Sequence, residues 1–137
     1  MTPRMALMRI GADRFALSLE RVLHILPAPS VFPLPLIRAV FQGVFIYQGE
    51  LVAQLEPAAL LGRSNGECPL TVVYGTDLGL LGLPVDQILQ IVELQMGTVE
   101  ACEPTPSARF PVQNKFVYNG NEYPWLDVEA LLQALPR

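Results

Sequence analysis

A β-hairpin is predicted by Gly43-Val44-Phe45-Ile46-Tyr47-Gln48-Gly49-Glu50-Leu51-Val52-Ala53-Gln54-Leu55-Glu56, a stretch in the first half of a 137-residue chain. Runs rich in β-branched and aromatic residues flank Gln48-Gly49, and glycine takes a positive φ at no steric cost. Phe45, Ile46 and Tyr47 are consecutive apolar residues, so we expect both faces of that arm to be covered and the hairpin to lie at the centre of the fold. If one face is exposed instead, its apolar side chains form a surface for a partner.

The residues before this hairpin predict three strands, at 5–10, 15–19 and 22–26. Each run is rich in apolar residues, and Glu20-Arg21 marks a break between the second and the third. Residues 31–42 carry several prolines and are expected to form a connector.

The residues that follow predict further short elements. A one-turn helix is expected at 57–62, with proline just inside its start and glycine at its end. The polar loop at 63–67 is expected at the surface, where the chain crosses from one lobe to another. A second hairpin is predicted from 70–74 and 78–83.

Two different patterns precede the C-terminal part. Val85, Ile88 and Ile91 recur every third residue, which fits a strand with a bulge or a brief helical turn better than a plain strand. Residues 93–111 are polar, contain prolines and follow no pattern, which predicts a long loop.

The C-terminal part predicts one more hairpin and a closing helix. Asn119-Gly120 is a strong hairpin signal. Asp127 can cap a helix. The apolar stripe of that helix is Val128, Leu131, Leu132 and Leu135. So short a helix must dock on the sheet to be stable. The chain is therefore predicted to be mainly β, with nine or ten short strands typical of small barrels or a sandwich.

The composition limits the classes of function. Hydrophobic residues make up 51% of the chain and charged residues 16%, which favours a large core and a surface kept for a partner. The net charge is −4 and the cations are scattered, so we expect no nucleic-acid binding. No apolar run approaches the roughly 20 residues of a membrane span, so no membrane insertion is expected. Cys68 and Cys102 could pair, but two reduced cysteines in a cytoplasmic protein are the preferred interpretation.

Few residues suggest chemistry. His24, the single histidine, lies in an apolar strand, where a structural role is favoured over a catalytic one. One histidine and two distant cysteines lack the spacing of a metal site, and we expect neither a metal nor a cofactor. Asp86 and Asp127 could form an acid–base pair, but a turn acceptor and a helix cap are simpler roles. Trp125 and Tyr47 could stack on a sugar or a base; core packing is favoured for Trp125, and both roles stay open for Tyr47.

Three stretches, in this order along the chain, resemble the motifs of CheW-like domains. The stretch from Gly43-Val44 through Gln48-Gly49 to Glu56 is similar to the hairpin G-V-x-N-L-R-G-x-V-x-P-V-x-D. Gly82-Leu83 followed by residues 85–91 resembles the run G-[IL]-x-V-D-x-V-x-x-V, and residues 125–132 resemble the C-terminal run L-[DN]-[VIL]-x-x-L-L. Order and spacing agree with the family over nearly the whole chain.

This resemblance implies a fold and a function. The fold would be mainly β, with two small five-stranded SH3-like barrels sharing one core and a short C-terminal helix, in a single domain over 1–137. The function would be that of an adaptor without catalysis in bacterial chemotaxis. Such adaptors join a CheA-type histidine kinase, through the CheW-like regulatory domain of the kinase, to the cytoplasmic tip of a methyl-accepting chemoreceptor.

The chain departs from the family pattern within the hairpin. The family's Asn, Arg, Pro and Asp are replaced here by Ile46, Gln48, Ala53 and Glu56. Glutamine restores only part of the hydrogen bonding of a five-donor guanidinium group. The fold therefore carries over from the resemblance more directly than the receptor contact does.

The hypothesis for the site is a partner-binding surface at the hairpin tip. Its residues are Phe45, Ile46, Tyr47, Gln48, Gly49 and Glu50. Two other functions remain open. The first is a CheW-like module of a non-chemotactic kinase pathway, such as pilus motility or gene regulation. The second is a small β-barrel that binds a ligand, or an enzyme whose active site is not recognisable from the sequence.

Overall fold

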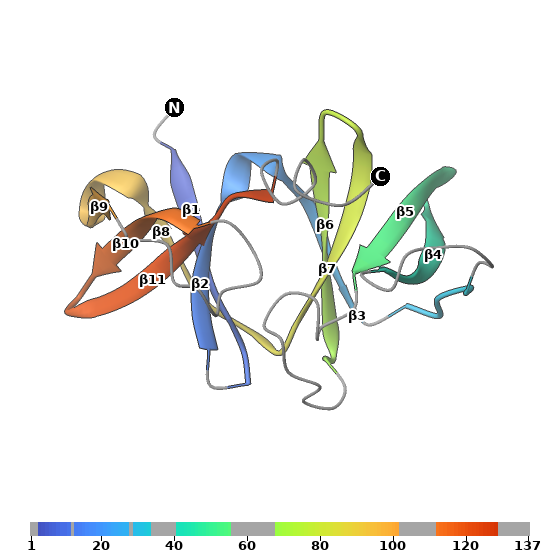
Figure 1. The fold of residues 1–137 in the computed structure, drawn as a ribbon, viewed down its shortest axis with the longest axis horizontal. Helices are drawn as coiled ribbons and strands as arrows, with labels where there is room; N and C mark the ends of the chain where they lie inside the picture. The colour runs from blue at the N-terminus through green and yellow to red at the C-terminus, as the bar shows by residue number, and fades with distance from the viewer. Residues whose placement is uncertain are drawn as a thin grey trace.

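The computed structural model describes six ranges of the chain: 3–11, 13–27, 29–33, 41–55, 68–101 and 112–128. Within these ranges the chain forms eleven strands and two short 3-10 turns. The strands make two sheets that lie side by side along the long axis of the molecule (Figure 1). The mainly β, two-lobed architecture expected from the sequence is confirmed.

The first sheet has six strands, in the order β8-β1-β2-β11-β10-β9. Their bounds are β1 Arg4–Ile10, β2 Asp13–Ser18, β8 Gln87–Glu93, β9 Thr98–Ala101, β10 Val112–Tyr118 and β11 Asn121–Leu126. The strands predicted at 5–10 and 15–19 are confirmed as β1 and β2, and the hairpin predicted at Asn119-Gly120 is confirmed as β10–β11. β8 pairs with β1 with a shift of register between Leu7 and Met8, which is the irregularity that the spacing of Val85, Ile88 and Ile91 predicted.

The second sheet has five strands, in the order β3-β6-β7-β5-β4. Their bounds are β3 Val22–Pro27, β4 Phe41–Tyr47, β5 Glu50–Leu55, β6 Leu70–Thr76 and β7 Gly79–Val85. Both predicted hairpins are confirmed, β4–β5 across Gln48-Gly49 and β6–β7 across Asp77-Leu78. The outer edge of β4 also receives Phe32, which forms an isolated bridge with Val44.

A shared core joins the two sheets. Met8, Phe15 and Leu17 of the first sheet are in one cluster with Leu55 and Leu83 of the second. Each sheet also has an inner face of its own. Because side chains alternate along a strand, Met5 and Leu7 of β1 point into the first lobe while Ala6 and Met8 point into the shared core. Strands of the two sheets thus contribute apolar side chains both to the shared core and to the interior of a lobe, which explains the apolar composition.

The interior of each lobe is filled by large side chains. Phe116 and Tyr123 pack with Met5 and Leu7 in the first lobe. Phe45, Val52 and Val73 pack in the second, with Leu26 and Tyr47 partly buried against them.

Two expectations are wrong in part. The long loop predicted at 93–111 contains η2, Leu94–Met96, and the strand β9. β9 pairs with β10, with Val99 opposite Phe116, and it brings the first sheet to six strands rather than five. β9 is only four residues long, Thr98-Val99-Glu100-Ala101, and all four are exposed, so the strand contributes no buried apolar side chain.

The predicted lobe crossing at 63–67 lies outside the described residues. The strands before and after it, β5 and β6, belong to the same sheet. In the described ranges the chain changes sheet at η1, Leu19–Arg21, and again at Asp86 between β7 and β8. Most of the closing helix and the one-turn helix at 57–62 also lie outside the described residues. Val128, the first residue of the predicted C-terminal stripe, is buried in the shared core.

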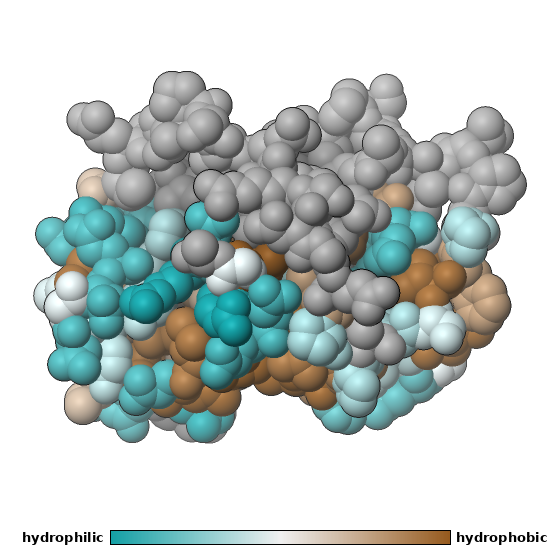
Figure 2. Space-filling model, turned by 90° about the horizontal axis from the view of Figure 1, so that it is seen from below, coloured by the Kyte–Doolittle hydropathy of each residue, from teal (hydrophilic) through white to brown (hydrophobic). Residues whose placement is uncertain are grey.

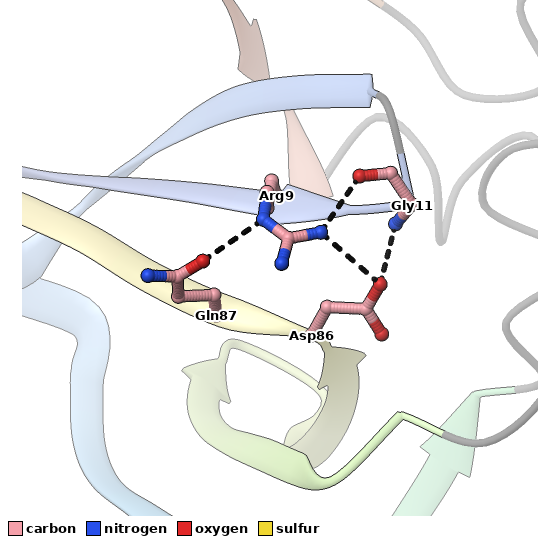
Figure 3. Close-up of polar contacts among 4 residues, drawn as sticks. All are labelled: Arg9, Gly11, Asp86 and Gln87. Atoms are coloured by element: carbon pink, nitrogen blue, oxygen red, sulfur yellow. Dashed lines mark hydrogen bonds and ion pairs between the residues drawn. The ribbon is translucent and has the colours of Figure 1, made fainter.

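Polar contacts hold the second change of sheet (Figure 3). Asp86 Oδ2 accepts a 2.6 Å hydrogen bond from the backbone N–H of Gly11 and lies 3.6 Å from Arg9 Nη1. The N–H of Asp86 donates to the carbonyl of Arg9, and Arg9 Nε donates to Gln87 Oε1, both at 2.9 Å. Asp86 therefore links the crossing between the sheets to the β1–β2 turn. It acts as a hydrogen-bond acceptor for that turn, which is the role that the sequence favoured over acid–base chemistry.

Candidate partner-binding surface

The hairpin tip is a tight two-residue turn. Gln48 has a φ of 48° and Gly49 a φ of 82°, and a turn with two positive φ values matches the twist of the strands that it joins. Tyr47 lies opposite Glu50, and Ile46 lies opposite Leu51. The turn therefore fixes which side chains of the two strands share a face.

The two faces of the tip differ in exposure. Phe45 is buried inside the second lobe, where it packs against Val52. On the opposite face, the exposed fractions of Ile46 and Leu51 are 66% and 67%. The expectation that both faces are covered, with the hairpin at the centre of the fold, is wrong. The alternative, a hairpin with one exposed apolar face, is the one found.

The position of the hairpin explains this exposure. β4 is an outer strand of its sheet, and the β4–β5 hairpin lies at the end of the molecule farthest from the other sheet (Figure 1). Ala53 still packs against the shared core. Leu51, two residues nearer the tip on the same face, projects beyond that core.

Phe32 extends the exposed apolar surface along β4. Its N–H donates to the carbonyl of Val44 at 2.8 Å, and the N–H of Val44 donates back at 3.0 Å. Opposite residues in an antiparallel pair share a face, and so do residues two apart on a strand. Phe32, which is 63% exposed, therefore lies on the face of Val44 and Ile46. We call Phe32, Ile46 and Leu51 the tip patch.

Gly43 makes room for this arrangement. A β carbon at Gly43 would collide with the backbone oxygen of Phe32. Seen from below, hydrophobic surface is visible at the end of the molecule where β4 and β5 lie (Figure 2). Exposed apolar residues grouped on one face are typical of a protein–protein contact.

Tyr47 is held by a residue that was not expected at this site. His24 Nδ1 lies 3.3 Å from the Tyr47 hydroxyl oxygen. The two rings meet edge to face, with centroids 5.7 Å apart and an interplanar angle of 82°. His24 is on β3 and Tyr47 is on β4, the two outer strands of the five-stranded sheet. The sheet therefore curls until side chains of its two edges touch.

The structure thus separates the six residues proposed from the sequence. Phe45 is a core residue, and Tyr47 is half-buried against His24. The other four are exposed, namely Ile46, Gln48, Gly49 and Glu50. Sequence reasoning did not include Phe32, Leu51 or His24 in the site. Leu51 could have been found from the register of the hairpin, whereas His24 and Phe32 reach the tip only through the curl of the sheet.

Within the ranges that the structure describes, no group of three His, Cys, Asp or Glu side chains is placed to hold a metal ion. No helix in those same ranges is long and apolar enough to cross a membrane.

Comparisons with known proteins concern nearly the whole chain. A family model described as CheW-like domain matches residues 4–135. Among solved structures, the chain is similar to the scaffolding protein TtCheW from Thermoanaerobacter tengcongensis, with a TM-score of 0.79 and 13% sequence identity. The match covers 93% of this chain and 90% of that chain. At this identity the likeness shows the fold. No curated protein sequence matches the chain.

Proposed function

Because this chain belongs to the CheW-like domain family, we propose that it is a non-catalytic adaptor of bacterial chemotaxis-type signal transduction. In this proposal it works in the cytoplasm and couples the regulatory domain of a CheA-type histidine kinase to the cytoplasmic tip of a chemoreceptor or a similar partner. Neither a cofactor nor a metal takes part.

The observation that carries the proposal is the tip patch. Phe32, Ile46 and Leu51 are each more than 60% exposed, on a hairpin whose opposite face is packed by Phe45. Leaving large apolar side chains in water forgoes roughly 1.5–3 kcal/mol for each one that could be buried. Covering them with a partner recovers part of that free energy.

A second exposed apolar area supports an adaptor with two partners. Met96 on η2 and Val99 on β9 are both exposed. η2 and β9 lie in the six-stranded lobe, at the end of the molecule opposite to β4 and β5 (Figure 1). Two separate surfaces allow two proteins to bind at the same time.

The filled interiors argue against the alternative of a ligand-binding barrel. Phe45 occupies the inside of one lobe and Phe116 the inside of the other. A site for a small molecule needs a cavity lined by a few convergent polar groups. The apolar side chains of the tip patch instead face outward.

Titration calorimetry tests the proposal. The chain is titrated against the regulatory domain of a CheA-type kinase and, separately, against the cytoplasmic tip of a chemoreceptor. Ile46→Ser is expected to weaken binding of the partner that uses the tip by about 1–3 kcal/mol, because buried apolar anchors dominate interfaces. Met96→Ser is expected to weaken only the partner that uses the other lobe.

Leu78→Ser is the matched control. Leu78 is 80% exposed and lies in the turn between β6 and β7, outside both apolar areas. All three variants are expected to keep the parent's melting temperature, since each replaced side chain is in water. The adaptor proposal fails if the parent binds neither protein, and the tip loses its assigned role if Ile46→Ser binds as Leu78→Ser does.

A second candidate is a CheW-like module of a non-chemotactic kinase pathway. Gln48 favours it, because this exposed residue stands where the family motif has an arginine. Binding to a kinase regulatory domain together with no binding to any receptor tip would select this candidate.

A further inference from the structure

His24 and Tyr47 form a contact that changes what the hairpin tip presents to a partner. The two residues lie 23 positions apart in the chain, and the Nδ1 atom of one meets the hydroxyl oxygen of the other at 3.3 Å. His24 is exposed and Tyr47 is half-buried. The contact therefore sits at the surface near the hairpin tip, on the face opposite to the tip patch.

The direction of this hydrogen bond depends on the proton count of the imidazole. In the neutral tautomer with its proton on Nε2, Nδ1 can only accept, so the Tyr47 hydroxyl donates to it. The outward lone pairs of the Tyr47 oxygen are then free to accept a hydrogen bond. In the imidazolium form both nitrogens donate, so Nδ1–H donates to the Tyr47 oxygen and the hydroxyl hydrogen turns outward. Protonation thus converts the outward side of Tyr47 from an acceptor to a donor.

We infer that His24 is a positioning residue of the tip surface. When His24 is neutral, the outward side of the Tyr47 oxygen accepts a hydrogen bond from a basic group of the partner. When His24 is protonated, the Tyr47 hydroxyl presents a donor there and this hydrogen bond is lost. This inference rests on the proposed function, since it assigns chemistry and regulation to the other face of the hairpin tip that carries the tip patch. Glu50 is the reason to expect a positively charged partner group, because its carboxylate is exposed and lies directly opposite Tyr47 on β5. A Lys or Arg of the partner is attracted by that carboxylate and has only donors to offer.

Other charged and titratable groups stand on the described elements around His24. They are Glu20 and Arg21 on η1, Tyr47 on β4, Glu50 on β5, Tyr74 on β6 and Asp77 in the β6–β7 turn. Arg21 Nη1 and Asp77 Oδ1 are paired at 3.4 Å. Histidine is the side chain whose charge normally changes between about pH 5 and 8, whereas carboxylates, tyrosines and arginines change outside that window. The chain has one histidine.

The free protein gives the first test. Nitrogen-15 spectra of the histidine ring and the carbon-13 shift of Tyr47 Cζ are followed from pH 8 to pH 5.5. We expect the neutral form of the ring to carry its proton on Nε2 and the Tyr47 shift to follow the protonation of the ring. In His24→Asn, whose amide oxygen stands near the place of Nδ1 and does not titrate, the Tyr47 shift should be constant. A neutral ring with its proton on Nδ1, or a Tyr47 shift that ignores His24, overturns the inference.

Binding gives the second test, with the regulatory domain of a CheA-type kinase and then a receptor tip as the probe. The Kd of the parent is expected to rise roughly 2- to 10-fold from pH 8 to pH 5.5, the effect of one hydrogen bond. In both His24→Asn and Tyr47→Phe, the ratio of the two Kd values should fall to the same lower value, which reflects the pH dependence of the probe itself. Glu50→Gln is the control: it should weaken binding at every pH and leave the ratio unchanged.

The outcomes separate this inference from the proposed function. If the parent binds neither probe at any pH, the adaptor proposal fails, and the spectra of the free protein alone decide whether His24 directs Tyr47. If the parent binds but Tyr47→Phe keeps the full pH ratio, the adaptor stands and the role of His24 is wrong.

Discussion

Gly82 lies beside Gln54 on the parallel neighbouring strands β7 and β5, and the space that a β carbon would take at Gly82 is already filled by Gln54 Oε1. Gln54 is 97% buried, since its exposed fraction is 3%, and its Nε2 donates to Thr71 Oγ1 at 3.0 Å. The ring of Phe45 closes the same space, 3.1 Å from where the β carbon would be. A glycine at this position therefore lets the second lobe hold a buried amide.

Gly82→Ala is expected to destabilise the protein by about 1–3 kcal/mol, because the added methyl group overfills a packed interior. Urea denaturation measures the loss. Gly75→Ala is the control, since its β carbon would meet its nearest neighbours at 3.8 and 3.9 Å, which is ordinary contact, and it should be neutral. In a Gln54→Ala background the penalty of Gly82→Ala should shrink, since contacting residues couple. Equal losses in both backgrounds would exclude the amide as the obstacle.

Asp86→Ala is expected to cost about 1–3 kcal/mol, because it leaves the Gly11 N–H without its acceptor and Arg9 without its ion pair. Asp86→Asn should lie between this variant and the parent, because it keeps an oxygen but loses the charge. Glu122→Gln is the comparison. Its carboxylate lies 2.7 Å from Lys115 Nζ but is largely in water, so its loss should be under roughly 1 kcal/mol. If Glu122→Gln costs more than Asp86→Ala, the contacts of Asp86 do not stabilise the crossing.

The two tight hairpins predict a pair of opposite effects. Gln48-Gly49 and Asn119-Gly120 have nearly the same φ values, 48° and 82° against 52° and 82°. Asparagine tolerates the left-handed conformation better than glutamine does. Gln48→Asn should therefore raise the free energy of unfolding by up to about 1 kcal/mol, and Asn119→Gln should lower it by a similar amount. Thermal unfolding of both variants checks this, and a change of the same sign in both would contradict it.

Gln48→Arg tests the departure from the family motif. The exposed guanidinium should strengthen binding to an acidic receptor tip by about 1 kcal/mol, or roughly fivefold, and added salt should reduce the gain. Gln42→Arg carries the same charge on β4 at an exposed position away from the tip. A gain that is equal in the two variants would reflect net charge and not the place of residue 48.

Local signals in the sequence were enough for most of the strands. The turns at Gln48-Gly49 and Asn119-Gly120 need positive φ values that few residue pairs supply, so their positions were predictable. The spacing of Ile88 and Ile91 likewise revealed the shifted register of β8. β9 was missed because its alternation, Thr98-Val99-Glu100-Ala101, is only four residues long and lies within a polar stretch that contains prolines.

The site was less predictable because its geometry is not local. The apolar run Phe45-Ile46-Tyr47 looks the same whether its second residue faces a core or water, and only the place of β4 at the end of the molecule decides between them. His24 meets Tyr47 because two edges of one sheet curl together. Asp86 meets Gly11 across 75 positions of sequence. No window of neighbouring residues contains either contact.

The two changes of sheet, at η1 and at Asp86, have a consequence for the order in which the protein assembles during synthesis. Every strand of the five-stranded sheet lies within residues 22–85, so that lobe can pair its strands as soon as this segment has left the ribosome. The β1–β2 hairpin emerges earlier, but its partners β8 and β11 are made only after all five strands of the other sheet. Closing so long a loop costs conformational entropy before any contact is gained. Phe15 and Leu17 of the nascent β1–β2 hairpin therefore stay uncovered until the five-stranded sheet has formed and they can pack against it. The six-stranded sheet, which contains the N-terminal strands, is completed after the five-stranded one.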